Sequence, residues 1–532
     1  MVGAYFGEAH PQVQPLTGSE QIRETKKQKV SPFDEDFAKL AEETLAQWHL
    51  PGVALAVVDG DETFAEGYGF AVLPDVPVRP STLFCTGSTT KSFTAAAAAL
   101  LVHDNDKYPH VKWDTPMNQL IRDDFVLQDD YTTLHATIED CISHRTGMPG
   151  HTLTIAGDSP EAATRNLRNL YIDKELRSGF EYCNIMYIAV SHMLQKVTGE
   201  WLGSFLRRRI WEPLKMHATF FTQQEAHQYI RDKDSTLQFA RPYIWDPETS
   251  SQRECPYWEN TAVSGAGSMV SNVLDYAKYT RSMIERSGPL SKEAHADLVT
   301  PRAFPPPPDT RFPTVSLYCL GWFSGIYHGE QVIHHSGSIE GFTANIVYLP
   351  ERKWGVVAMC NQMGPGREVL VWKLVDDFLK VPLEKRIDIY ALYKKGEESV
   401  KDRVQHAQKY LYPSIPSPPL PTTLPLADYV GRYTHPVYPA FTISLSTDPE
   451  PHLIAYAMDM VETTLKLTHV SRDFFTAELR VFRYARDPCA VGRAEFQVDA
   501  KGVPKFGAEL DFASEDGGGK IWFKRSNDGT QD

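Results

Sequence analysis

Strand-forming segments lie at both ends of the region from about residue 50 to residue 360, and the pattern between them is helical. Val53–Val58 is an uninterrupted apolar run that predicts a buried strand, and the turn Asp59-Gly60-Asp61 leads into a returning strand over Thr63–Phe70. Further strands are expected at Tyr318–Ile326, Gln331–His335, Thr343–Leu349 and Trp354–Cys360. Since strands must pair along their edges, both sets are expected to share one antiparallel sheet. The predicted fold is α/β (α+β), with helices on the faces of the sheet and an all-helical insert at about 105–260.

A proline-rich run divides the chain. Pro413–Pro421 cannot pack regularly and reads as a polyproline linker. Short strand-like segments after it predict a small all-β barrel or sandwich. The expected organisation is a mobile N-terminal arm (1–30), a first domain (31–390), a helix with the proline-rich linker (391–426) and a C-terminal all-β domain (427–532).

Charge and cysteine usage narrow the class of protein. The formal net charge is −14 and there is no long basic run, which argues against nucleic acid or an anionic membrane as partner. No apolar span is long enough for a transmembrane helix, and the first residues lack the pattern of a signal peptide. The seven cysteines are scattered and form no Cys-x-x-Cys, as expected for free thiols in a reducing compartment. We therefore expect a cytoplasmic protein.

The stretch Cys85–Ser92 combines a serine with a lysine three residues later. It reads as a tight turn that opens a buried helix, so that Ser88 and Lys91 fall on one face. A serine nucleophile needs a group that lowers the cost of losing its proton, and a lysine at this spacing can be that group. A simpler interpretation makes Ser88 a helix cap and Lys91 a solvated residue of the first turn. The apolar helix behind Lys91 argues against a solvated lysine.

Two later blocks add to this pair. Tyr182-Cys183-Asn184 enters a second helix, and His335-Ser336-Gly337 lies on a predicted strand. With Ser88-Thr89-Thr90-Lys91, they resemble the class C beta-lactamase group of serine enzymes, whose pattern is Ser-x-x-Lys, Tyr-x-Asn and Lys/His-x-Gly. This group includes family VIII carboxylesterases, D-aminopeptidases and lovastatin-type acyltransferases. The resemblance covers about residues 35–385 and implies a beta-lactamase/transpeptidase-like fold. The tail from about 427 is similar to the lipocalin-like β domains that follow some of these hydrolases.

The resemblance also implies a role for each residue. Ser88 would be the acyl-accepting nucleophile, Tyr182 the general base and Lys91 the neighbour that shares the proton. Asn184 would bind the substrate and hold Lys91, and Gly337 would let the substrate approach the strand edge. The backbone N–H groups of Ser88 and Ser338 would form the oxyanion hole. If Tyr182 is instead a core aromatic and Asn184 a helix cap, this site does not exist.

His335 departs from the lactamases, which carry lysine at that position. Because histidine is mostly neutral at pH 7, the substitution favours an ester or amide substrate over a β-lactam carboxylate. We predict a serine hydrolase that acts through an acyl-enzyme on a small-molecule ester or amide. An acyltransferase of secondary metabolism that takes an acyl donor, and a non-catalytic binding protein, are the alternatives. No metal or organic cofactor is implied, and the oligomeric state stays open.

Overall fold

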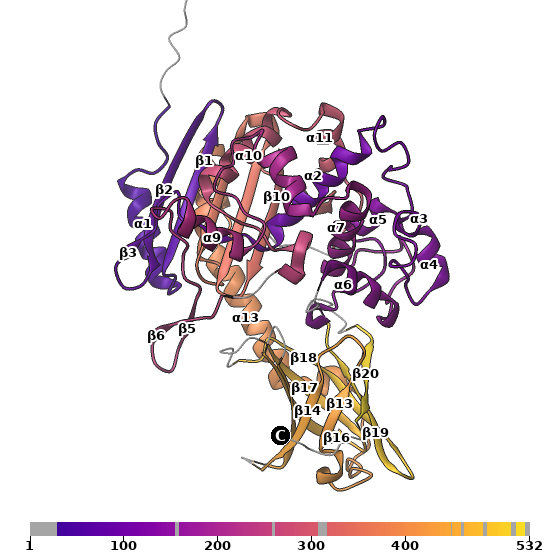
Figure 1. Ribbon diagram of the computed structural model, residues 1–532. Helices are drawn as coiled ribbons and strands as arrows, with labels where there is room; N and C mark the ends of the chain where they lie inside the picture. Colours follow the sequence, from indigo (N-terminus) through magenta and orange to yellow (C-terminus); the bar gives the residue numbers. More distant parts are fainter. Residues whose placement is uncertain are drawn as a thin grey trace, which may run out of the picture. The chain divides into compact units, whose positions relative to one another are not determined.

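The computed structural model describes residues 29–154, 159–257, 261–306, 316–447, 450–458, 462–481, 487–511 and 518–526. Apart from residues 29 and 30, the predicted N-terminal arm lies outside this part of the chain. The described chain contains an α/β region with a large sheet, followed by a β-barrel (Figure 1).

The large sheet is antiparallel and is built from both ends of the first domain, as predicted. Its strand order is β3-β2-β1-β12-β11-β10-β9-β8. The two sets of strands meet where β1 pairs with β12, with Val53 opposite Cys360. The strands are β1 (Gly52–Asp59), β2 (Glu62–Val72), β3 (Val76–Pro77), β8 (Leu317–Tyr318), β9 (Phe323–Tyr327), β10 (Glu330–Ile339), β11 (Phe342–Leu349) and β12 (Trp354–Cys360).

Both faces of this sheet are covered by helices. Because successive side chains of a strand point to opposite faces, β1 divides its residues between two cores. Val53, Leu55 and Val57 pack with α1 (Glu35–Gln47) and α12 (Gly366–Leu379). Ala54 and Ala56 belong to the other core, where α10 (Val273–Glu285) contacts the sheet. This two-sided burial explains why the strand reads as an uninterrupted apolar run.

Helix α2 (Thr90–Val102) is buried along its whole length, as its apolar sequence predicts. It packs against α7 (Asn184–Thr198) and α11 (Lys292–Val299). The helical insert also contains α3 (Met117–Leu120), α4 (Asp130–His135), α5 (Ile138–Ile142), α6 (Pro160–Asn166), α8 (Leu202–Leu206) and α9 (Gln223–Asp232). Two short strand pairs are also present. β5 (Tyr243–Asp246) pairs with β6 (Ser251–Glu254) within the insert, and β4 (Phe84–Cys85) pairs with β7 (Val270–Ser271) from its two sides.

Two predicted strand boundaries were wrong. The strand expected over Tyr318–Ile326 is interrupted between β8 and β9 at Gly321, which has φ +76°. A Cβ atom on Gly321 would lie 2.8 Å from the backbone oxygen of Lys91, so the break lets the sheet approach α2. Strand β10 extends beyond the predicted His335 to Ile339. It pairs with β9 only as far as His334, which leaves the edge of β10 after that residue open to other elements.

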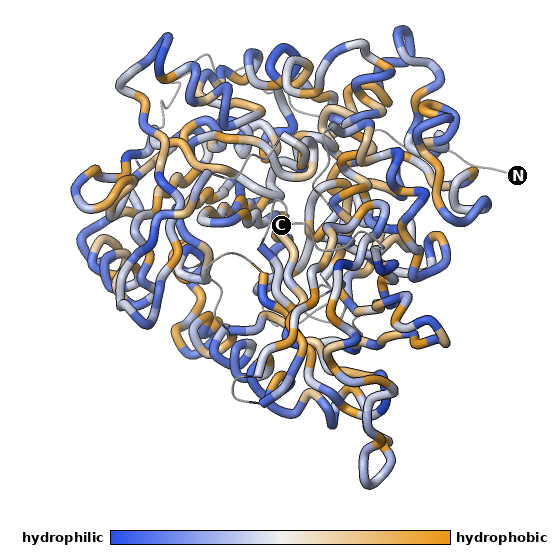
Figure 2. The backbone as a smooth tube through the Cα atoms, turned by 60° about the horizontal axis from the view of Figure 1, so that its bottom comes forward, coloured by the Kyte–Doolittle hydropathy of each residue, from blue (hydrophilic) through white to orange (hydrophobic). Residues whose placement is uncertain are grey.

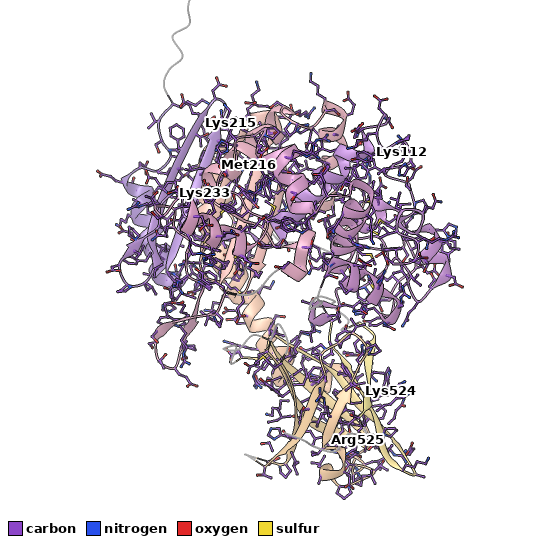
Figure 3. The ribbon with its side chains drawn as sticks, in the orientation of Figure 1. Lys112, Lys215, Met216, Lys233, Lys524 and Arg525 are labelled. Atoms are coloured by element: carbon purple, nitrogen blue, oxygen red, sulfur yellow. The ribbon has the colours of Figure 1, made fainter. Side chains whose placement is uncertain are left out.

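The C-terminal β domain is a closed eight-stranded barrel, so the prediction of a small all-β barrel is confirmed. Helices α13 (Ile389–Gln405) and α14 (Ala407–Leu411) precede it. Lys524 and Arg525 lie on the barrel in Figure 3, on the strand that pairs with β13 and closes the barrel. The outer turns of the molecule are mostly hydrophilic (Figure 2). The barrel strands are β13 (Gly431–Thr434), β14 (Phe441–Ser446), β15 (His452–Met458), β16 (Glu462–Ser471), β17 (Phe474–Val481), β18 (Ala490–Asp499), β19 (Gly502–Glu509) and β20 (Lys520–Arg525).

The barrel forms hydrogen bonds with the helical insert through His151, which is 1% exposed. His151 Nε2 lies 3.0 Å from the backbone oxygen of Tyr171, an atom that can only accept, so this nitrogen carries the ring proton. His151 Nδ1 then accepts from the Tyr438 hydroxyl at 2.6 Å. Nearby, Gly150 N–H donates to Asp511 Oδ2 at 3.0 Å. These bonds join the barrel to the segment that precedes α6.

This contact predicts a loss of stability in acid. Burial lowers the pKa of His151 to about 4, below the value of about 6.5 expected in the unfolded chain. The stabilisation is therefore complete above pH 6.5 and is lost as the pH falls toward 4. Between pH 7.5 and pH 5, His151 alone should lower the free energy of unfolding by about 2 kcal/mol. Urea unfolding of His151→Asn, which does not titrate, should show a correspondingly flatter pH dependence. Equal pH dependence in both proteins would contradict the prediction.

Candidate active site

Ser88 lies in a short 3₁₀ turn, η1 (Gly87–Thr89), directly before α2. The turn begins with Gly87 at φ +51°, a conformation that favours glycine. Ser88 is partly exposed, whereas its neighbours Gly87 and Thr89 are buried. The Ser88 side chain is therefore partly accessible at the start of the buried helix α2.

Lys91 is fully buried, and its ammonium nitrogen has three oxygen neighbours. Lys91 Nζ lies 3.0 Å from Ser88 Oγ, 2.7 Å from Asn184 Oδ1 and 2.8 Å from the backbone oxygen of Ala266. The interpretation of Lys91 as a solvated residue of the first turn is therefore wrong. The helix-cap interpretation of Ser88 also fails, because η1 and α2 have no side-chain cap hydrogen bond.

The second predicted block lies beside the first. Tyr182 precedes α7, and the Ser88 hydroxyl lies beside its phenol group, where it acts to lower the phenol pKa. Lys91 Nζ is 4.9 Å from the centroid of the Tyr182 ring. Asn184 is the first residue of α7, and α7 has no side-chain cap, so Asn184 does not cap the helix. Its side chain holds Lys91 instead.

The third block reaches the same place through the open edge of β10. A Cβ atom on Gly337 would lie 2.0 Å from the backbone oxygen of Thr86 and 2.9 Å from the nitrogen of Ser88. A Cβ atom on Gly87 would likewise lie 2.7 Å from the nitrogen of Ser338. The strand and the turn can approach this closely because both carry glycine at the contact.

His335 is 2% exposed, and its side chain packs beside Tyr318. Its Nδ1 lies 2.6 Å from the backbone oxygen of Ser336, so Nδ1 carries the proton, and Nε2 can accept from the Tyr318 hydroxyl at 3.4 Å. Burial, together with the nearby Lys91, lowers the pKa of His335 to about 3. His335 is therefore neutral at physiological pH.

Burial also sets the protonation of the central pair. It lowers the pKa of Lys91 well below its usual value, because the charged ammonium loses its hydration. It raises the pKa of Tyr182 above its usual value, although the neighbouring Ser88 hydroxyl opposes this. Desolvation therefore favours a neutral amine next to a protonated phenol in the free enzyme.

The sequence did not identify two of these contacts. The backbone oxygen of Ala266 belongs to η5 (Thr261–Ala266) and contacts Lys91 Nζ. Tyr318 is fully buried, and its hydroxyl also lies 3.3 Å from that of Tyr187. A backbone oxygen can belong to any residue type, so the sequence does not mark it as an acceptor. Tyr318 looks in the sequence like any other aromatic residue of a strand.

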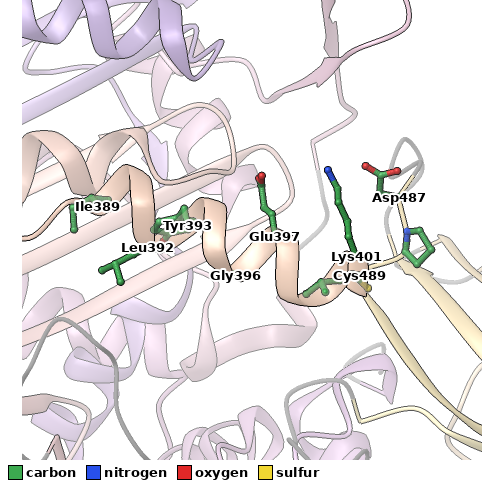
Figure 4. A pocket seen from close by; sticks show the side chains of 10 residues that line it. Ile389, Leu392, Tyr393, Gly396, Glu397, Lys401, Asp487 and Cys489 are labelled. Atoms are coloured by element: carbon green, nitrogen blue, oxygen red, sulfur yellow. The ribbon is translucent and has the colours of Figure 1, made fainter. Parts of the chain in front are cut away.

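A separate pocket of about 550 Å³ lies between α13 and the segment Asp487–Cys489 (Figure 4). Leu392, Tyr393 and Val400 contribute apolar surface, but the lining holds neither a serine nor a histidine. It is therefore not the candidate active site. Within the described residues, no group of three or more histidine, cysteine or acidic side chains could hold a metal ion.

Gly337→Ala should impair the site sterically. The new methyl group would collide with the backbone of Thr86 and force β10 away from η1. We expect turnover to fall at least about 10-fold, because small displacements of reacting groups are costly. Ester hydrolysis and thermal unfolding would be measured together. Gly396→Ala in α13 is the matched control, because nothing lies within 4 Å of its Cβ position. Wild-type turnover in Gly337→Ala would refute the close approach.

The beta-lactamase family profile matches residues 37–380. The chain belongs to the beta-lactamase family. A second profile, described as a domain of unknown function (DUF3471), matches residues 416–525, which include the barrel.

This family member also has relatives along nearly its whole length. It is 38% identical over 510 residues to the unguisins hydrolase ungD′ of Aspergillus campestris, with 93% of each chain covered. The octameric penicillin-binding protein homologue from Pyrococcus abyssi superimposes with a TM-score of 0.59 at 22% identity, covering 89% of this chain and 97% of that one. D-amino acid amidase from Ochrobactrum anthropi gives 0.53 at 22% identity, covering 66% and 98%. These likenesses confirm the beta-lactamase/transpeptidase-like fold, and the family with its hydrolase relatives confirms a serine hydrolase.

Proposed function

We propose that Ser88, Lys91 and Tyr182 are the catalytic residues and that Ser88 carries the acyl group. The observation that supports this most directly is that Lys91 Nζ contacts Ser88 Oγ and Asn184 Oδ1 and lies 4.9 Å from the centroid of the Tyr182 ring. In this proposal Asn184, His335, Gly337 and Ser338 bind the substrate, and the N–H groups of Ser88 and Ser338 stabilise the oxyanion.

Lys91 is suited to take the proton of Ser88. Two of its three neighbours, Asn184 Oδ1 and the oxygen of Ala266, can only accept hydrogen bonds. A neutral amine donates its two protons to them, and its lone pair is then left for the Ser88 hydroxyl. Ser88 Oγ attacks the substrate carbonyl carbon, its proton passes to Lys91 Nζ, and the carbonyl oxygen becomes the oxyanion.

Tyr182 as general base stays a prediction from the resemblance. The direction of its pKa favours the opposite role in the first step, since a protonated phenol can donate its proton to the leaving nitrogen or oxygen. The newly protonated Lys91 would stabilise the phenolate that this leaves. In the second step, water attacks the acyl carbon while the phenolate takes a proton from it. The bond between Ser88 Oγ and the acyl carbon then breaks, and Lys91 returns its proton to Ser88 Oγ. Tyr182 then acts as a base only in deacylation.

The substrate class we propose is the amide of an unguisin-type compound. The support is the long relative named an unguisins hydrolase, which matches both the family region and the C-terminal part. His335 is neutral, and burial disfavours the charged form of Lys91, so neither side chain is suited to supply the cation that would hold a β-lactam carboxylate. We expect penicillin to be a poor substrate. Acyl transfer uses the same groups and stays an alternative.

The test is intact-protein mass spectrometry after incubation with unguisins, p-nitrophenyl esters of several chain lengths and a penicillin. We expect a transient acyl adduct on the wild type and products enlarged by one water molecule. An added amine acceptor that captured most of the acyl group would favour the transferase. Absence of adduct and product with every compound would contradict the proposal.

We also propose a cytoplasmic location and a small-molecule ester or amide as the partner. The support for the location is that no disulfide joins the cysteines, all seven of which lie in the described part of the chain. No helix among the described residues is long and apolar enough to cross a membrane. Fractionation of cells that express a tagged full-length chain would test the location, and recovery with membranes or in the medium would contradict it.

A further inference from the structure

His144 is a buried histidine to which no step of the proposed reaction assigns a role. It lies two residues after α5 and is 0% exposed. Its backbone has φ +62°, a left-handed conformation that few residues other than glycine adopt. An uncommon backbone conformation at a buried polar residue calls for a compensating contact.

That contact is with the segment that carries Tyr182. The backbone oxygen of His144 accepts from the N–H of Glu181 at 2.9 Å. Its ring atom Nδ1 accepts from the N–H of Cys183 at 3.0 Å. The residues on both sides of Tyr182 are therefore bound to this one histidine. The imidazole also packs against the phenol ring, with 4.3 Å between the ring centroids.

The protonation state of His144 follows from these bonds. Because Nδ1 accepts, the ring proton must be on Nε2, which is buried and has no hydrogen-bond partner among the described residues. The rings of Phe180, Tyr187 and Tyr318 lie around it. Burial, and then the proximity of Lys91 and His335, hold the pKa of His144 well below its usual value. A doubly protonated ring would point two donors at each other at Cys183, so the contact requires the neutral form.

We propose that His144 is the positioning residue for Tyr182. Its backbone oxygen and Nδ1 hold Glu181 and Cys183, and its ring sets the orientation of the phenol that faces Ser88. The inference rests on the proposed role of Tyr182 in proton transfer. It assigns His144 no contact with the substrate.

Two substitutions separate the hydrogen bond from the packing. His144→Asn places an amide oxygen where Nδ1 was, and asparagine tolerates a left-handed backbone. His144→Phe keeps a ring in the aromatic surroundings but leaves the N–H of Cys183 without its acceptor. His295→Phe is the matched control. His295 is also a buried histidine, with 1% of its surface exposed, but its charged neighbour is Arg286 and not Lys91.

The experiment combines acylation by a p-nitrophenyl ester with hydrogen–deuterium exchange of the peptide that contains Glu181–Cys183. For His144→Phe we expect acylation to slow at least about 10-fold with KM changed less than about 3-fold, and faster exchange in that peptide. His144→Asn should recover most of the acylation rate and the slow exchange. His295→Phe should lower the melting temperature without slowing acylation.

Wild-type acylation in His144→Phe, or equal losses in His144→Phe and His144→Asn, would overturn the inference. If His144→Phe does not fold, His144→Leu, which also lacks an acceptor, is compared with His144→Asn by the same criteria. If the wild type itself forms no acyl-enzyme, the proposed function fails. The exchange data then decide separately whether His144 holds the segment: unchanged exchange in the variants overturns the inference, and faster exchange reversed by asparagine supports it.

Discussion

Ser88→Ala should abolish the acyl adduct and lower turnover at least about 10³-fold, because the nucleophile belongs to one unit with its proton acceptor. The change removes only one oxygen from a partly exposed residue, so the fold should be kept. Adduct formation would be followed by intact mass and turnover by nitrophenol release, with circular dichroism as the check on folding.

A second serine provides the control for that experiment. Ser336 is exposed on β10, two residues before the Ser338 backbone proposed for the oxyanion hole. Ser336→Ala should keep nearly full activity. An acyl adduct that persisted in Ser88→Ala would place the nucleophile elsewhere and would contradict the proposed mechanism.

Lys91→Arg should be as inactive as Lys91→Ala, each at least about 10³-fold below the wild type. Arginine keeps the positive charge but cannot be deprotonated in a protein, so it cannot take the proton of Ser88. The variant therefore distinguishes a role of Lys91 as a base from a role that needs only its positive charge. Substantial activity in Lys91→Arg would show that the residue acts only through its charge.

The pH dependence tests the same assignment. Burial lowers the pKa of Lys91 well below its usual value, which favours the neutral amine. As the pH falls through this lowered pKa, Lys91 becomes protonated and kcat/KM should decrease. The decrease should therefore lie far on the acid side of the pKa of an ordinary lysine. A rise in kcat/KM toward acid pH would contradict the role of Lys91 as a base.

The sequence predicted the sheet well because its signals are local. Apolar runs, short turns and the position of the helical region already indicate that β1 and β12 come from opposite ends of the domain. The break at Gly321 could not be foreseen, because its cause is the backbone of Lys91, far away in the chain. Only a few barrel strands were recognised from the sequence, although strands such as β15 and β16 alternate between buried and other residues, the pattern of a half-buried strand.

In the candidate site, too, local motifs were predicted and contacts between distant residues were not. The three motifs that were expected to meet lie together at Ser88. The sequence revealed them because each motif contains residue types that the chemistry requires. The acceptor at Ala266 is 175 residues from Lys91 and uses only its backbone. The hydrogen bonds of His144 to Glu181 and Cys183 depend on its left-handed backbone, which its residue type does not predict.

The pairing of β1 with β12 also has a consequence for synthesis of the protein. On the ribosome, Val53 emerges long before Cys360, its partner across the sheet. Until then the apolar β1 lacks one neighbour, and the edge of β10 that must lie against Ser88 does not yet exist. Folding of the domain therefore awaits nearly its whole length, as for other structures dominated by distant contacts. A chain cut short before β10 would carry Ser88 and Lys91 but could not assemble the reactive centre, so incomplete products should be inert and in need of protection from aggregation.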